Sequence, residues 1–232
     1  MQQLLHMNDV YSNYIVRVSM VIAPFFVFGM INGVYNASLA QASPTMFWLI
    51  DMLGWIALPS AILYYIYRYY GIGLRDYGFT KLKGAYQRRE IINWSFLATF
   101  ILSIYYFAFG WLAWEFIDAP VSSFSYGGMV PEGDARYLAI FYLAVTAAVF
   151  EEIFFRGLIW RLVYSSALPY NKAVIYVVIS SVLFGLVHWE NGMPEVFAAM
   201  VFGIVACVLY LRLRNLIPLI FAHFCIDVFN FW

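Results

Sequence analysis

Long apolar runs, separated by short polar segments, fill almost the whole chain of 232 residues. Each run is about 17 to 23 residues long and lacks strict alternation, which matches an α-helix that crosses about 30 Å of hydrocarbon and not a membrane β-strand. The pattern predicts an all-α, polytopic membrane helical bundle that forms a single transmembrane domain over residues 1–232. We expect about seven membrane-spanning helices, within a range of about six to eight, at residues 14–34, 46–67, 91–114, 136–157, 172–188, 195–211 and 216–232.

The composition agrees with a lipid environment. Hydrophobic residues make up 64% of the chain and charged residues 11%, whereas roughly 25% of a soluble domain is charged. Lipid favours an apolar surface and requires backbone polar groups to be paired inside the protein, as they are in helices. The formal net charge is zero, so no basic surface indicates a nucleic-acid partner. Cys207 and Cys225 lie in apolar runs without the spacing of a disulfide framework or zinc motif, and they are expected to pack.

The distribution of basic residues predicts how the helices are oriented. The segment between the second and third predicted helices carries Arg68, Arg75, Lys81, Lys83, Arg88 and Arg89. The positive-inside rule places this segment in the cytoplasm. The loops predicted on the other side, near 35–45, 115–135 and 189–194, contain no Lys or Arg. We therefore expect an integral protein of the plasma (inner) membrane with a cytoplasmic N-terminus.

Two polar segments are expected to be exposed to solvent. Residues 71–90 are predicted to form a cytoplasmic surface segment that acts as a solvated connector between two helices. Glu190, Asn191 and Glu195 fall in a predicted outer loop and are likewise expected to be solvated. Neither segment is assigned a functional role.

The second half of the chain places ionisable residues inside apolar runs: Glu151, Glu152, Arg156, His188, His223 and Asp227. An Asp or Arg near the centre of a membrane helix costs about 2.5 to 3.5 kcal/mol on insertion scales. Several such residues therefore require pairing with one another, a water-filled cavity or a function. Two histidines and two further carboxylates on three late helices favour a shared functional site.

Helical spacing sorts the acidic residues. Side chains four positions apart share a helix face, whereas adjacent ones diverge by about 100°. Glu152 and Arg156 are therefore predicted to form an ion pair that staples the helix. Glu151 then points elsewhere without a local counter-charge, which makes it the candidate reactive carboxylate.

The two histidines have helical partners as well. His223 and Asp227 lie four positions apart and can face one cavity, while His188 follows Phe184 by four positions and shares its face. At about 1.5 Å per residue, Glu151 and His223 fall nearer the inner side of the membrane, and His188 falls nearer the outer side. A shared site requires these three side chains to lie at one depth.

Three motifs follow one another on separate predicted helices: Glu151-Glu152-x-x-x-Arg156, Phe184-x-x-x-His188 and His223-x-x-x-Asp227. Their order and spacing resemble the CAAX protease and bacteriocin-processing family, also called the Abi family, whose members are intramembrane endopeptidases. The resemblance makes residues 135–232 the catalytic helical core. It implies a hydrolase that cleaves peptide bonds inside the membrane.

The resemblance also implies a role for each motif residue. Glu151 is expected to act as the base that activates water, with His188 helping to hold that water. His223 and Asp227 are expected to stabilise the oxyanion of the tetrahedral intermediate by preorganised hydrogen bonding. The site is expected to rest on three supporting residues, Glu152, Arg156 and Phe184.

Two mechanisms are compatible with these residue types. Many relatives carry Asn at the position of Asp227, and an amide can donate a hydrogen bond where an ionised Asp only accepts. In a metal-free reaction, Asp227 would mainly orient His223 while Glu151 accepts a proton from water. Alternatively, Glu151, His188, His223 and Asp227 offer nitrogen and oxygen ligands suited to zinc. We favour a glutamic-type protease without a cofactor, because the spacing lacks a compact His-Glu-x-x-His pair.

The residues leave the substrate and two rival functions open. The resemblance implies a peptide, or a lipidated or membrane-anchored protein, as substrate in CAAX-type, precursor or bacteriocin processing. A membrane transporter or a proton or cation pathway could use the same buried Glu, His and Asp residues, and a non-catalytic scaffold could retain them as packing. A cysteine protease is disfavoured, because Cys225 lies two positions from His223 and projects to another face.

Overall fold

The computed structural model describes residues 19, 23, 43–79, 84–117, 130–165 and 171–232. The regular structure in these residues is helical, which confirms the all-α fold. The predicted span 14–34 lies almost wholly outside the described residues, and each of the other predicted spans falls on an observed helix. In chain order the elements are α2 (Pro44–Met52), η1 (Leu53–Ala57), α3 (Leu58–Tyr70), α4 (Gly84–Phe116), α5 (Ala135–Glu151), η3 (Glu152–Leu158), α6 (Ile159–Ser165), α7 (Lys172–Leu186), η4 (Trp189–Asn191), α8 (Met193–Leu213) and α9 (Ile217–Phe231).

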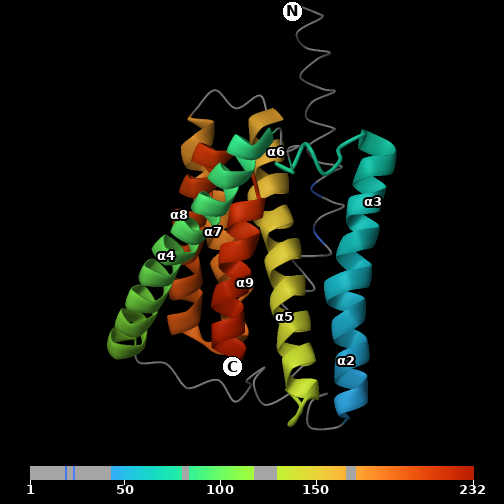
Figure 1. The fold of residues 1–232 in the computed structure, drawn as a ribbon, viewed down its shortest axis with the longest axis vertical. Helices are drawn as coiled ribbons and strands as arrows, with labels where there is room; N and C mark the ends of the chain where they lie inside the picture. Colours follow the sequence, from blue (N-terminus) through green and yellow to red (C-terminus); the bar gives the residue numbers. More distant parts are fainter. Residues whose placement is uncertain (1–18, 20–22, 24–42, 80–83, 118–129, 166–170) are drawn as a thin grey trace, which may run out of the picture.

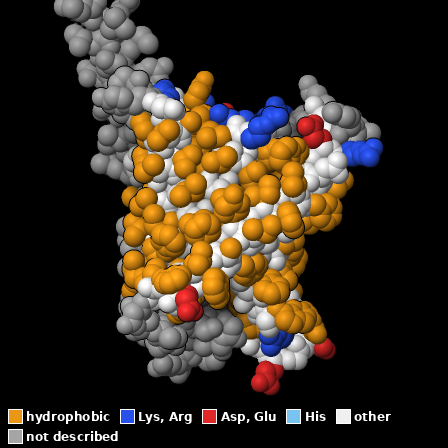
Figure 2. All heavy atoms as spheres, turned by 90° about the vertical axis from the view of Figure 1, so that its left-hand side faces the viewer, with side chains coloured by type: hydrophobic (Ala, Val, Ile, Leu, Met, Phe, Trp, Pro, Cys, Tyr) orange, Lys and Arg blue, Asp and Glu red, His pale blue; other side chains and the backbone are white. Residues whose placement is uncertain are grey.

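The helices stand side by side in an elongated bundle (Figure 1). The helical stretches that are long and apolar enough to cross a membrane are Thr45–Tyr70, Gln87–Phe116, Ala135–Ser165 and Met193–Leu213, and Lys172–Leu186 and Ile217–Phe231 are shorter apolar helices. Hydrophobic side chains cover the middle of the face seen in Figure 2, and charged side chains gather at its two ends. Large exposed side chains such as Phe100 and Trp111 on α4 contribute to the apolar surface that a bilayer favours.

Prolines and glycines set several helix ends. Pro194 and Pro218 lie in the first turns of α8 and α9, where the missing N–H of proline has no intrahelical partner to lose. Pro59 lies inside the first long helical stretch, and the π-helical element η1 ends two residues before it. α3 ends at Gly71, whose φ of 67° is a conformation that glycine adopts without a steric penalty.

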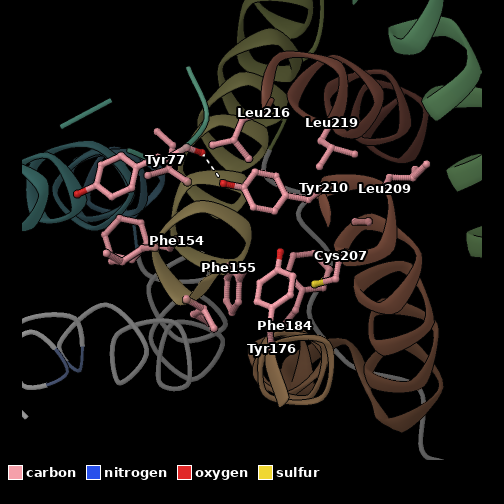
Figure 3. Packing of buried hydrophobic residues seen from close by; sticks show 14 of the residues in the cluster. Tyr77, Phe154, Phe155, Tyr176, Phe184, Cys207, Leu209, Tyr210, Leu216 and Leu219 are labelled. Atoms are coloured by element: carbon pink, nitrogen blue, oxygen red, sulfur yellow. Dashed lines mark hydrogen bonds between the residues drawn. The ribbon is translucent and has the colours of Figure 1, made fainter. Parts of the chain in front are cut away.

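The segment that follows α3, residues 71–79, packs into the bundle. Ile72 is 3% exposed and Tyr77 is 1% exposed. The Tyr210 hydroxyl donates to the backbone oxygen of Tyr77 at 3.0 Å, within the buried cluster drawn in Figure 3. The expectation of a solvated connector over 71–90 is therefore wrong for Ile72 and Tyr77, which lie against apolar side chains of the core. The end of the predicted connector is already part of α4.

Gly185 on α7 allows α8 to approach closely. A Cβ atom added at Gly185 would lie 2.7 Å from the Val196 oxygen and would overlap the Met200 side chain. Gly185→Ala is therefore expected to push α7 and α8 apart and to lower the free energy of unfolding by about 1 to 3 kcal/mol. Thermal unfolding in detergent measures this loss. Gly110→Ala is the control, since a Cβ there would meet only Ala198 at 3.8 Å, and equal stability of the two variants would contradict the packing argument.

Candidate active site

The helix that runs from α5 into α6 carries a buried acidic pair where its π-helical stretch begins. Glu151 is the last residue of α5, and Glu152 is the first residue of η3. Glu151 is 5% exposed, and Glu152 and Arg156 are fully buried. Ionised groups buried in this way require compensating partners, so the contacts of these side chains define the candidate site.

His223 on α9 is surrounded by three carboxylates. Its Nδ1 lies 2.9 Å from Glu152 Oε1. Its Nε2 lies 3.7 Å from Glu151 Oε2 and 3.5 Å from Asp227 Oδ2. The structure therefore brings the first and third sequence motifs together at one imidazole. Glu151, which was predicted to lack a local counter-charge, faces a histidine from a distant part of the chain.

The predicted ion pair between Glu152 and Arg156 is confirmed, and it is part of a larger network. Arg156 Nε lies 3.3 Å from Glu152 Oε2. The other Glu152 oxygen faces His223, so one carboxylate links the guanidinium to the imidazole. Arg156 Cζ also lies 4.1 Å from the centroid of the Phe184 ring and 5.4 Å from that of Phe202. These are cation–π distances, and they attach α7 and α8 to the network.

His188 follows α7 and lies next to this network. Its Nδ1 is 2.7 Å from the Phe184 oxygen, so Nδ1–H donates to that carbonyl and Nε2 is left as an acceptor. The rings of His188 and His223 lie 4.8 Å and 5.9 Å from the Phe184 ring, which therefore contacts both imidazoles. Among the described residues, no hydrogen bond or ion pair joins His188 directly to Glu151 or Asp227.

The predicted difference in depth between His188 and Glu151 is wrong. Helices α5 and α7 run in opposite directions (Figure 1), and the rings of Phe155 and Phe184 meet at 5.1 Å. Glu151 comes four residues before Phe155, and His188 comes four residues after Phe184. Because the two helices are antiparallel, both residues lie about one turn from the Phe155–Phe184 contact, toward the same end of the bundle. Counting from the predicted helix ends failed because the helix of Glu151 continues to Ser165, well beyond its predicted end.

The comparison with known families agrees with the motif residues. Residues 134–229 of the chain match the family model described as Type II CAAX prenyl endopeptidase Rce1-like. This segment belongs to the CAAX protease and bacteriocin-processing family. No curated protein and no solved structure matches the chain. The Rce1-like segment runs from α5 into α9 and contains all three motifs. The long apolar helices of the chain are those of an integral membrane protein.

The Rce1-like segment also contains two acidic residues that were expected to be solvated. Glu195 lies in the first turn of α8, and the Tyr106 hydroxyl on α4 donates to its Oε1 at 2.6 Å. Asn230 on α9 donates to the Tyr106 oxygen at 3.3 Å. Glu190 in η4 is partly buried, and this burial raises its pKa to about 7. The expectation of solvated side chains is therefore wrong for both Glu residues, because the turn before α8 and the first turn of α8 pack into the bundle.

Another buried carboxylate, Asp51, is one that the apolar pattern did not single out. Asp51 on α2 is fully buried, and the Tyr142 hydroxyl on α5 donates to its Oδ2 at 2.8 Å. The feature of the sequence that could have identified this carboxylate is an Asp residue inside the apolar run 46–67. Tyr142 lies nine residues before Glu151, which at about 100° per residue turns the two side chains to opposite faces of the helix. Asp51 therefore joins α2 to the Rce1-like segment away from the His223 network.

The zinc alternative depends on which donor atoms of the candidate ligands are already engaged. Among the described residues, no group of three or more His, Cys, Asp and Glu side chains is placed to hold a metal ion. Nδ1 of His223 faces the Glu152 carboxylate, and Nδ1 of His188 faces a backbone carbonyl. Metal-bound histidines commonly donate their other ring N–H to a carboxylate or a backbone carbonyl, so in both residues Nε2 is the ring nitrogen left for a ligand.

Proposed function

We propose that this protein is an intramembrane endopeptidase in which Glu151 activates water for attack on a peptide bond and His223 stabilises the oxyanion that forms. The observation that carries the proposal is the convergence of Glu151 Oε2 and Asp227 Oδ2 on His223 Nε2, at 3.7 and 3.5 Å. Neither carboxylate oxygen has a hydrogen-bond partner among the described residues. Polar atoms separated by about 3.5 Å or more are commonly bridged by water. The attacking water is therefore proposed to bind beside these three atoms.

In the proposed reaction, the Glu151 carboxylate removes a proton from water while the water oxygen attacks the carbonyl carbon of the substrate. The carbonyl π electrons move to its oxygen, and His223 Nε2–H stabilises this oxyanion by donating a hydrogen bond. The C–N bond then breaks, and the proton held by Glu151 passes to the nitrogen of the leaving amine. The products are a carboxylic acid and an amine, and Glu151 returns to its carboxylate form.

Glu152 and Asp227 are proposed to prepare His223 for this role. The imidazole lies between carboxylates at both nitrogens, so it can keep a proton on each of them, with Nδ1–H donating to Glu152. An ionised Asp227 only accepts hydrogen bonds, so we assign it to orienting His223 and not to binding the oxyanion. His188, whose Nε2 is an acceptor, is proposed to receive a hydrogen bond from the attacking water.

The substrate class proposed here is a prenylated C-terminal peptide, as in the description of the matching family. Purified protein in lipid nanodiscs is mixed with a farnesylated, fluorescence-quenched CAAX peptide and with the same peptide lacking the farnesyl group. Cleavage of the farnesylated peptide, with its fragments identified by mass spectrometry, supports both the protease and its substrate class. Equal cleavage of both peptides supports the protease but not the prenyl preference. Absence of cleavage together with proton or cation flux in liposomes overturns the proposal in favour of a transporter.

Chelation is expected to leave the rate of cleavage unchanged. The proposed reaction uses a carboxylate as the base, and the described His, Cys, Asp and Glu side chains are not placed to bind a metal ion. The measurement is the cleavage rate before and after incubation with EDTA or 1,10-phenanthroline. Complete loss of activity that zinc restores would establish metal-dependent hydrolysis and refute the glutamic mechanism.

A further inference from the structure

Tyr106 on α4 joins two helices of the candidate site by hydrogen bonds. Its hydroxyl donates to Glu195 Oε1 on α8 at 2.6 Å, and its oxygen accepts from Asn230 Nδ2 on α9 at 3.3 Å. A hydroxyl that donates to a carboxylate forms one of the stronger hydrogen bonds in proteins. Tyr106 lies outside the Rce1-like segment, so neither the motifs nor the family match assigns it a role.

The place of α4 in the bundle gives this link its importance. Helices α8 and α9 share few contacts with each other, and both pack along α4, which runs obliquely beside them in Figure 1. Helix α8 carries Glu195 and Phe202, whereas α9 carries His223 and Asp227. Contacts with α4 therefore determine how the residues of α9 are placed relative to those of α8.

Asn230 lies on the same face of α9 as the two site residues of that helix. It follows Asp227 by three positions and His223 by seven, which is the spacing of one helix face. Asp227 also interacts electrostatically with Tyr106 and with Glu195, so it lies close to their hydrogen bond. The bond from Asn230 to Tyr106 therefore fixes the rotation of α9 about its axis in the turn next to Asp227.

The ring of Tyr106 also contacts the surroundings of His223. It meets the Phe202 ring edge-on at 6.1 Å between centroids, and the Phe202 ring lies 5.0 Å from that of His223. Phe202 is 2% exposed. Because protein interiors are close-packed, a displacement of Tyr106 would displace a ring that contacts the imidazole.

We propose that Tyr106 is a positioning residue of the endopeptidase site. Its hydroxyl links Glu195 on α8 to Asn230 on α9, and this link sets the direction from which His223 faces Glu151. Tyr106 acts through α9 and does not touch the reacting atoms. The catalytic consequence of this inference rests on the proposed function, whereas the placement of α9 can be measured independently of any activity.

Tyr106→Phe tests the inference in a cleavage assay, because it removes the hydroxyl and keeps the ring. We expect kcat to fall by about 10- to 100-fold with little change in KM, since a displacement of about 1 Å in a catalytic constellation costs about 100-fold. The adjacent Tyr105 provides the matched control. Tyr105 is 44% exposed and its ring stacks on Phe109, and its hydroxyl forms no hydrogen bond with the described residues. Tyr105→Phe is therefore expected to keep the wild-type kcat.

Substitutions of Glu195 separate the hydrogen bond from the charge. Glu195→Gln keeps an oxygen that can accept from the Tyr106 hydroxyl, so it is expected to retain more of the wild-type kcat than Glu195→Ala. The double variant Tyr106→Phe/Glu195→Ala is expected to lose no more than Tyr106→Phe alone, because the two residues act as one unit. Thermal unfolding in detergent verifies that each variant is folded.

Several outcomes would overturn the inference. Equal kcat values for Tyr106→Phe and Tyr105→Phe would do so, as would an effect on KM alone, additive losses in the double variant, or a Glu195→Gln variant as impaired as Glu195→Ala. A structure of Tyr106→Phe is expected to show His223 Nε2 farther from Glu151 Oε2 than 3.7 Å, and an unchanged distance would refute the inference even if cleavage fell. If the wild-type protein cleaves no peptide, the proposed function fails, and this structure still decides whether Tyr106 places α9.

Discussion

Glu151→Gln is expected to abolish peptide cleavage while leaving the fold intact. Gln is nearly the same size as Glu, and Glu151 Oε2 has no hydrogen-bond partner among the described residues, so the substitution removes little packing. It does remove the carboxylate that is proposed to accept a proton from water. General base catalysis contributes about 10²- to 10⁴-fold to a rate, so kcat is expected to fall by at least about 10²-fold.

Glu190→Gln is the matched control for this prediction. Glu190 is a partly buried carboxylate, but it lies in η4, and among the described residues no hydrogen bond or ion pair joins it to His223. This variant is expected to cleave at the wild-type rate. Circular dichroism and thermal unfolding in detergent verify that both variants are folded. Wild-type cleavage by Glu151→Gln would exclude Glu151 as the base, and a loss in both folded variants would mean that the effect is not specific to position 151.

The helices could be predicted from the apolar pattern because crossing a bilayer requires a long run of apolar side chains. The residues at which the helices end could not be predicted from this pattern. The run predicted to end at residue 157 continues as helix to Ser165, past the polar Arg161. The buried hydrogen bond from the Ser180 hydroxyl on α7 to the Phe155 oxygen could not be predicted either, because it joins two helices that are far apart in the sequence.

The site was predictable where its contacts are local and unpredictable where they are not. The Glu152–Arg156 pair follows from a spacing of four residues on one helix. The contact between Glu152 and His223 depends on how α9 packs against α5, which no local pattern encodes. The motif order nevertheless indicated that these helices share a site, since each carries ionisable groups that lipid disfavours.

Arg156→Leu is expected to cause a large loss of stability. Arg156 and Glu152 are both fully buried, and removal of one member of a buried pair leaves an uncompensated charge at a cost of about 3 to 5 kcal/mol. The substitution also removes the cation–π contact with Phe184. Thermal or denaturant unfolding in mixed micelles measures the loss. Arg212→Leu, at an exposed arginine near the end of α8, is expected to be close to wild type and serves as the control.

The double variant Glu152→Leu/Arg156→Leu separates stability from chemistry. Replacing a whole buried ion pair by apolar residues of similar volume is often neutral, or stabilising by about 1 to 4 kcal/mol, so the double variant is expected to regain the stability that Arg156→Leu loses. Cleavage is not expected to return, because His223 Nδ1 loses the Glu152 carboxylate that orients the ring. A stable double variant that cleaves at the wild-type rate would show that the contact between Glu152 and His223 is dispensable. A double variant as unstable as Arg156→Leu would contradict the argument from charge compensation, because it contains no uncompensated Glu152 carboxylate. The fold would then require the contacts of Glu152 and Arg156 themselves.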